Sequence, residues 1–148
     1  MKKRWIGIGV ILVAVAIGVT AAAVYWFAPR NLGEVYPVLA EGNYFGYLKQ
    51  GTRTYDFPET MDSQVVGMLF QKAEVKRGNE TRQEPEVAFC LKMVGEENLT
   101  IVVGQNGRIM LAQTGNLDDT WKYWQDDGWL FTALYDFYIQ QGGEPLAG

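Results

Sequence analysis

Residues 86–112 read EVAFCLKMVGEENLTIVVGQNGRIMLA, and this stretch decides the expected fold. Large apolar side chains occupy every second position from 87 to 93, which is the period of a strand with one buried face. Residues 95–98 then turn the chain into a second β-prone run at 99–103. The dipeptide Asn106-Gly107 accepts the positive φ angles of a tight type I′ turn, and a third strand is expected after it. The stretch therefore predicts a three-stranded antiparallel meander.

The residues before the meander predict a hairpin and a helix. The β-prone runs 44–49 and 52–57 are joined through Gln50-Gly51, and a proline follows them. In 61–73 the apolar residues fall on one side of a helix, and Asp62 or Ser63 is expected to cap its start. The segment 78–85, GNETRQEP, is polar and turn-rich, which predicts a loop.

The C-terminal part is rich in aromatic residues and predicts helices. One of the two acids at 118–119 is expected to cap a short helix through Trp121 and Trp124. A second helix is expected to begin near 126–127 and to end at 142–143, where two glycines stop it. The predicted fold class is therefore α+β, a hairpin plus a three-stranded meander packed by two or three helices.

Residues 5–27, WIGIGVILVAVAIGVTAAAVYWF, carry no charge. A helix of this length covers ~34 Å, enough to cross a hydrocarbon core of ~30 Å. The three basic residues at 2–4 and the aromatic residues at both ends predict a cytoplasmic N-terminus in a single-pass protein of the cell membrane. We expect a basic tip and transmembrane anchor over 1–29, a linker over 30–42 and an extracytoplasmic domain over 43–148.

Two further interpretations of the apolar segment stay open. Ala21 and Ala23 offer a signal-peptidase site, although the segment is longer than the ~7–15 apolar residues usual in a signal peptide. Ala14, Gly18 and Ala22 recur every four residues, which would allow two such helices to form a homodimer. Small residues are common in spanning helices in any case, so this second pattern is weak.

Composition excludes several classes of activity. The 148 residues include no His, so Ser-His-Asp triads, Cys-His pairs and most zinc sites are excluded. Without the three basic residues at 2–4, 10 basic and 17 acidic residues remain in the chain. This acidic balance argues against nucleic acid and against electrostatic adhesion to anionic lipid. The single cysteine, Cys90, is expected to be inert, and no cofactor or metal is predicted.

An aromatic cluster near the C-terminal end is the candidate contact surface. An exposed aromatic platform can hold a sugar, a peptide or a small ligand. Core packing is the competing explanation, because large aromatic side chains fill small cores. Trp129 lies off the apolar stripe of its predicted helix, so we expect it to be partly exposed. With the loop 78–85, the candidate binding residues are Trp121, Tyr123, Trp124 and Trp129.

Four carboxylates near this cluster allow an alternative, a cell-wall-active enzyme. A glycosidase needs two carboxyl groups facing each other across ~5–9.5 Å, and Asp119 and Asp127 are the best candidates. Asp118 and Asp126 complete the set, which also resembles a calcium site but lacks the required spacing. Helix capping explains all four acids, so we expect no catalytic residue.

The order of elements resembles a group of bacterial domains. A hairpin, a helix, a meander with a charged turn at 95–98 and the Asn106-Gly107 turn, and an aromatic helix are similar to small membrane-tethered outer-face domains of Firmicutes-type Gram-positive bacteria. Their function is mostly unknown. The resemblance covers 40–141, rests on element order and carries over no functional residue. It implies a bacterial cell-surface protein.

The expected function is a non-enzymatic, membrane-anchored extracytoplasmic domain. It would contact the bilayer through 5–27 and bind a protein, peptide or small ligand through the aromatic cluster. The enzyme described above is one alternative. A small subunit of a membrane complex, with the spanning helix as its interface, is the other.

Overall fold

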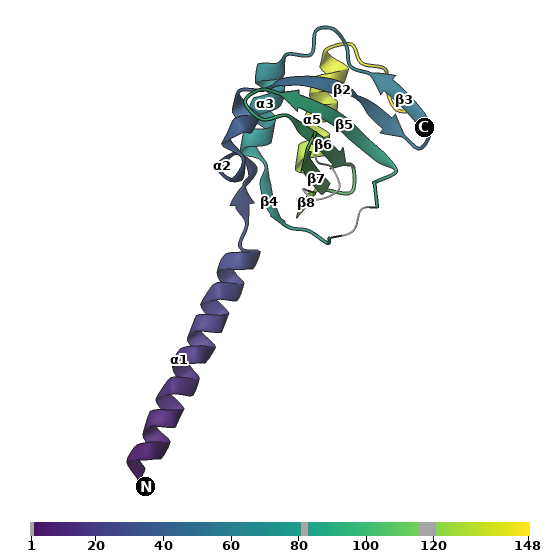
Figure 1. Ribbon diagram of the computed structural model, residues 1–148. Helices are drawn as coiled ribbons and strands as arrows, with labels where there is room; N and C mark the ends of the chain where they lie inside the picture. The colour runs from purple at the N-terminus through teal and green to yellow at the C-terminus, as the bar shows by residue number, and fades with distance from the viewer. Residues whose placement is uncertain (1, 81–82, 116–120) are drawn as a thin grey trace.

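A computed structural model describes residues 2–80, 83–115 and 121–148. Its N-terminal helix α1 (Lys2–Phe27) stands apart from an α+β domain, as Figure 1 shows. No residue of α1 from Gly7 to Trp26 is buried, and this segment is long and apolar enough to cross a membrane. The prediction of an N-terminal apolar helix and of the α+β fold class is confirmed.

The domain is built on one antiparallel sheet. In the described part of the chain it has eight strands, in the order β1-β4-β8-β7-β6-β5-β2-β3. Their bounds are β1 (Arg30–Asn31), β2 (Asn43–Gln50), β3 (Arg53–Asp56), β4 (Glu74–Arg77), β5 (Val87–Val94), β6 (Leu99–Gly104), β7 (Arg108–Gln113) and β8 (Lys122–Gln125).

The central strands follow the predicted pattern. β5, β6 and β7 form the meander, with Phe89 opposite Val103 and Ile101 opposite Leu111. β2 and β3 form the hairpin, whose turn holds Gly51 at a φ of 61°. The sheet is larger than the sequence predicted, because β2 also pairs along its whole length with β5 and because β1, β4 and β8 extend the other side.

The predicted short helix through Trp121 and Trp124 is wrong. Residues 122–125 form β8, which pairs with β7 on one side and with β4 on the other. Trp124 faces the core, whereas Trp121 and Tyr123 pack on the opposite face of the sheet. This alternation is the period of a strand, and the pairing partners on both sides decide it.

Residues 30–42 are part of the folded domain and not the linker that the sequence suggested. They form β1, the short helix α2 (Leu32–Val35) and the 3-10 helix η1 (Pro37–Ala40). Leu32 and Leu39 are fully buried in the core. These elements are only two to four residues long, so they carry no periodic signal.

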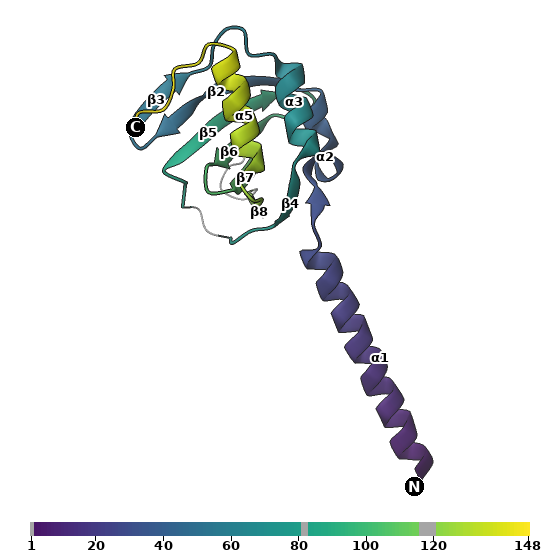
Figure 2. The ribbon, with the colours of Figure 1, turned by 180° about the vertical axis from the view of Figure 1, so that it is seen from behind.

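Two helices cover one face of the sheet. Figure 2 shows α3 (Ser63–Lys72) and α5 (Trp129–Gln140) side by side in front of the strands. Both were predicted. The Asp62 carboxylate accepts a hydrogen bond from the Gln64 N–H at 2.8 Å and caps α3. The Ser63 hydroxyl accepts instead from the Tyr44 N–H at 2.9 Å and ties the helix to β2.

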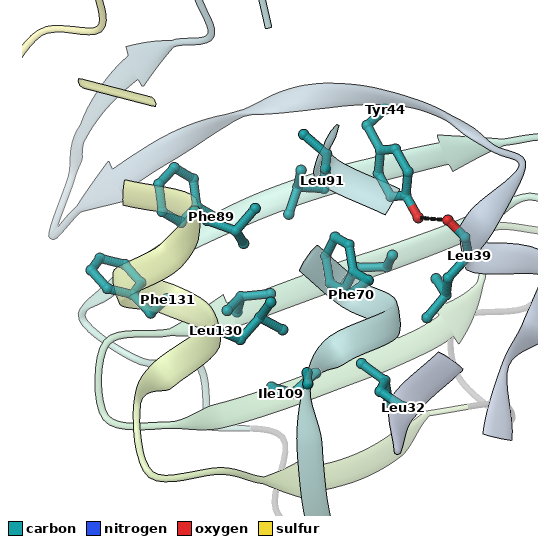
Figure 3. Close-up of a cluster of buried hydrophobic side chains, with 14 of the residues drawn as sticks. Leu32, Leu39, Tyr44, Phe70, Phe89, Leu91, Ile109, Leu130 and Phe131 are labelled. Carbon is teal, nitrogen blue, oxygen red and sulfur yellow. Dashed lines mark hydrogen bonds between the residues drawn. The ribbon is translucent and has the colours of Figure 1, made fainter. Parts of the chain in front are cut away.

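The core between sheet and helices is aromatic and closed. Tyr44 of β2 stacks on Phe70 of α3, with their ring centroids 5.4 Å apart (Figure 3). Phe89 of β5 meets Phe131 and Tyr138 of α5 at 5.2 and 5.9 Å. The Tyr44 hydroxyl donates a hydrogen bond to the Leu39 carbonyl. Among the described side chains of α1, from Gly7 to Trp26, none belongs to this core.

Candidate functional site

The junction between α1 and the domain lies at β4. The Arg77 guanidinium stands 3.5 Å from the centroid of the Trp26 ring, in the last turn of α1. Arg30, which pairs with Val75 of β4, lies over the Tyr25 ring and donates to the Tyr25 carbonyl at 3.4 Å. These contacts place β4 and its neighbours beside the C-terminal end of α1.

A cleft of about 650 Å³ opens at this junction. Its volume falls in the range of ~300–1,000 Å³ that is usual for ligand sites. The walls come from the segment after α1, the end of α3, β4, β8 and the beginning of α5. We call it the Trp129 cleft, and its lining residues are Pro29, Lys72, Glu74, Lys76, Arg77, Gln125, Asp126, Asp127 and Trp129.

The Trp129 cleft carries charges of both signs that do not neutralise each other directly. Three lining residues are basic and three are acidic. Within the described residues, the ion pairs closer than 4.0 Å are Lys49–Glu84 and Arg53–Glu144, and neither belongs to the cleft. Basic and acidic side chains of the cleft can therefore both interact with a ligand, because the described lining residues form no ion pair with one another.

Two of the carboxylates in the cleft hold the beginning of α5. Asp126 accepts hydrogen bonds from the N–H groups of Gly128 at 2.8 Å and Leu130 at 2.9 Å. Asp127 accepts from the Trp129 N–H at 3.1 Å. The predicted capping role of both acids is confirmed. Asp118 and Asp119, the other candidates for capping or catalysis, lie outside the described residues.

Burial changes the electrostatics of one of these acids. Partial burial raises the pKa of the Asp126 carboxyl above its usual range, although its two backbone hydrogen bonds act in the opposite direction. The neighbouring Asp127 charge raises this pKa further. The Asp126 carboxylate is thus held at an energetic cost that its contacts with the helix N-terminus only partly offset.

The structure does not bring the four candidate aromatic residues together. Trp129 is 42% exposed and borders the cleft, as its position off the apolar stripe predicted. Trp124 is only 4% exposed, and its indole N–H donates to the Tyr36 hydroxyl at 3.1 Å inside the domain. Trp121 and Tyr123 lie on the other face of the sheet. Trp124 is therefore a core residue, and Trp129 is separated from the other two.

The described residues of the candidate loop 78–85 are not among those that line the cleft. Gly78 donates its N–H to the Tyr123 carbonyl at 3.0 Å, which continues the contact between β4 and β8. The Asn79 carbonyl accepts a hydrogen bond from the Arg108 guanidinium at 3.2 Å. Residues 81–82 lie outside the described part of the chain.

Sequence reasoning missed the basic residues of the cleft. Lys72, Lys76 and Arg77 stand within six residues of each other in a chain that is acidic beyond α1. This local concentration of positive charge was a usable signal. The neighbouring Glu74 belongs to the same run, so the sequence already contains the mixed charge of the site.

Another, smaller pocket lies on the face of the sheet that α3 and α5 do not cover. It measures about 300 Å³ and is lined by Phe45, Gly46, Tyr47, Cys90, Leu91, Lys92 and Thr100. Burial raises the pKa of the Cys90 thiol, which disfavours the reactive thiolate. This environment agrees with the inert thiol expected from the sequence.

Comparison with known proteins gives no family for this chain. No protein-family model, curated protein or solved structure matches it. The similarity in element order to Firmicutes-type surface domains therefore stays an expectation, and the function has to be inferred from the chain's own geometry.

Proposed function

We propose that the chain is a membrane-anchored, extracytoplasmic binding domain, not an enzyme, and that its ligand occupies the Trp129 cleft. The observation that carries this proposal is the bare surface of α1. From Gly7 to Trp26 no residue is buried, and Trp26 meets the domain at Arg77 of β4. An apolar helix of this length is stable where hydrocarbon covers it.

The charge distribution supports the orientation. The basic residues at 2–4 precede the apolar run, and the rest of the chain is acidic. Positive residues next to a spanning helix favour the cytoplasmic side, so the domain after Arg30 belongs on the outer side of the cell membrane. The resemblance in element order to tethered bacterial domains supports the same location.

Binding is favoured over catalysis by the state of the acids in the cleft. Asp126 and Asp127 accept hydrogen bonds from the N–H groups at the start of α5, and so their positions serve the fold. The exposed Trp129 ring beside charges of both signs offers stacking and ion pairing. These are means of holding a ligand.

The anchored location is tested by protease treatment of intact and lysed cells that produce the chain with a C-terminal epitope. We expect the protease to remove the domain from intact cells. The mass of the chain extracted from the membrane should include residues 1–29. A chain that begins after Ala23, or a domain that the protease reaches only in lysed cells, would contradict the proposal.

The binding role is tested by comparing two tryptophan variants of the full chain. Trp129→Ala removes the exposed ring of the cleft, whereas Trp121→Ala removes a ring from the opposite face of the sheet. Partners captured from membranes by wild type are expected to be lost with the first variant and retained with the second. Equal capture by both variants would exclude the cleft as the contact surface.

A second candidate function is a small subunit of a membrane complex. It rests on the recurrence of Ala14, Gly18 and Ala22 along one side of α1, which would let a second helix approach closely. Cross-linking from this side of the helix should then yield a defined partner or a homodimer. The variant Gly18→Leu should abolish that product.

A further inference from the structure

The Trp129 cleft lies next to the end of the apolar helix. Pro29 lines the cleft and stands two residues after Phe27, the last residue of α1. Two residues of chain span at most ~7 Å. Figures 1 and 2 both show β4 and β8 on the side of the domain that faces α1. When α1 spans a bilayer, this wall of the cleft stands at the level of the lipid headgroups.

The charges on β4 alternate along the strand. Glu74 and Lys76 are both exposed and point to the same side, because the residue between them, Val75, is buried in the core. They stand ~7 Å apart along the strand. A phosphate and an ammonium joined by a two-carbon link can reach both side chains at this spacing.

A ligand with one sign of charge suits this cleft poorly. A simple anion would approach Lys72 and Lys76 but would also meet three carboxylates, and a simple cation would meet the basic residues. A molecule that carries both signs satisfies both sets. Lysine ammonium groups bind phosphate, carboxylates bind an ammonium group, and the face of Trp129 attracts a cation.

We infer that the Trp129 cleft binds the headgroup of a zwitterionic outer-leaflet phospholipid with a primary ammonium group, the chemistry of phosphatidylethanolamine. The phosphate is held by Lys72 and Lys76. The ammonium group is held by Glu74 and Asp127, under the ring of Trp129. This inference rests on the proposed function, because the cleft meets lipid only when α1 is retained as an anchor.

Headgroup binding gives the cleft a role in orientation. The domain as a whole is acidic and is not drawn to a membrane surface by its net charge. A specific headgroup contact beside the helix would hold the domain against the bilayer in one orientation.

The test uses the full chain, extracted from membranes into a detergent with uncharged sugar headgroups. Native mass spectrometry then counts lipid adducts as phosphatidylethanolamine, phosphatidylcholine or anionic phosphatidylglycerol is added. Phosphatidylethanolamine is expected to form a one-to-one adduct at the lowest concentration, because its ammonium group donates hydrogen bonds that choline lacks. Equal binding of the three lipids would overturn the inference.

Charge-neutralising variants test the two halves of the site. Lys76→Gln is expected to weaken phosphatidylethanolamine binding about tenfold, the effect of one lost charged contact. Glu74→Gln should weaken this lipid similarly and strengthen phosphatidylglycerol, a reversal that a purely structural role does not produce. Lys92→Gln and Glu86→Gln, on exposed residues outside the cleft, are the matched controls and should bind as wild type does. Variants that match these controls would overturn the inference.

Two additional measurements distinguish a lipid from a soluble ligand, and distinguish a failure of this inference from a failure of the proposed function. Soluble glycerophosphoethanolamine and inorganic phosphate should need a much higher concentration than the lipid. Occupancy by either at the same concentration would overturn the lipid source. The same spectra give the mass of the chain. A chain that retains 1–29 but binds no lipid overturns only this inference, whereas a chain beginning after Ala23 overturns the proposed function.

Discussion

The Arg77 guanidinium lies over two indole rings, 3.5 Å from the centroid of Trp26 and 5.5 Å from that of Trp124. Trp26 belongs to the apolar helix, and Trp124 belongs to the core of the domain. One side chain of β4 thus connects the two parts of the molecule. Because Arg77 also lines the Trp129 cleft, the position of the helix end and the shape of the cleft are linked.

Removal of this connection is expected to loosen the domain on its helix. Arg77→Ala abolishes two cation–π contacts, each worth ~0.5–2 kcal/mol. Spin labels on cysteines introduced at Val24 and Lys92, in a Cys90→Ala background, should show a broader distance distribution in this variant. Arg53→Ala is the control, because Arg53 lies over the Tyr55 ring at 5.0 Å and away from α1. Equal widths in the two variants would contradict the connecting role.

Two phenylalanines, one buried and one exposed, are expected to contribute differently to the free energy of unfolding. Phe70 is fully buried and stacks on Tyr44, whereas Phe45 on the other face of the sheet is 61% exposed. Phe70→Ala should lower the free energy of unfolding by ~3–5 kcal/mol. Phe45→Ala should change it by less than ~0.5 kcal/mol. Urea unfolding of the full chain in detergent, followed by near-ultraviolet circular dichroism, measures both. A large loss in the second variant would mean that Phe45 is covered.

The strands that could be predicted are those whose apolar residues alternate over many consecutive positions. Strict alternation over 87–93 and a turn at Asn106-Gly107 were sufficient to predict the meander. The predicted type I′ turn is wrong, because Gly107 has a positive φ and Asn106 does not. Trp121 and Trp124 have the i, i+3 spacing of a helix. In the structure they lie on opposite faces of the sheet, because β7 and β4 pair with β8 on both sides. Four residues carry too little pattern to reveal such pairing in advance.

The sequence predicted Trp129 and the two acids at the start of α5 as candidate residues, but not the basic residues of the cleft. Trp129 was expected to be exposed because it lies off the apolar stripe of its helix, and it is. Lys72 and Lys76 join it only because β4 pairs with β8, which sets Lys76 opposite Gln125 and brings it to the start of α5. The residues of either strand alone do not indicate that β4 pairs with β8.

The Asn106-Gly107 turn is expected to be sensitive to a single added methyl group. Gly107 has a φ of 88°, and a Cβ there would collide with the Asp126 carbonyl oxygen. Gly51 has a φ of 61°, but a Cβ there meets nothing within 4 Å. Gly51→Ala should therefore cost only the ~1–2 kcal/mol of a left-handed residue, and Gly107→Ala should cost more. Equal losses in urea unfolding would show that the collision relaxes.

The Cys90 thiol is expected to react slowly in the folded chain. Burial raises its pKa from the ordinary 9.0 and the Glu84 charge raises it further, although the Tyr47 hydrogen bond and the Lys49 charge act in the opposite direction, so that less thiolate is present at a given pH. The rate of alkylation by iodoacetamide should have its midpoint above pH 9.0 in the folded chain and return to the ordinary value in denaturant. Glu84→Gln should move the folded midpoint down. Coinciding midpoints for folded and denatured wild type would contradict this environment.

The Asp126 carboxyl predicts a pH dependence of stability with a definite sign. Its pKa is raised in the folded chain from the ordinary 3.8, mainly by burial, so the folded state binds more protons than the unfolded state between the two pKa values. The contribution of Asp126 to stability must therefore be most favourable below pH 3.8 and must fall as pH rises through the folded pKa.

Asp126→Asn isolates this effect. The variant keeps one acceptor for the Gly128 or Leu130 N–H but has no charge, so it should start with a constant loss of ~1 kcal/mol from the missing acceptor. As pH rises above 3.8, the free energy of unfolding of wild type should fall relative to that of the variant. Asp127→Asn, on an exposed neighbour that also accepts one N–H, is the matched control for the loss of a capping carboxylate. A difference between wild type and Asp126→Asn that stays constant with pH would mean that the folded carboxyl titrates as it does in the unfolded chain, and that water reaches it freely.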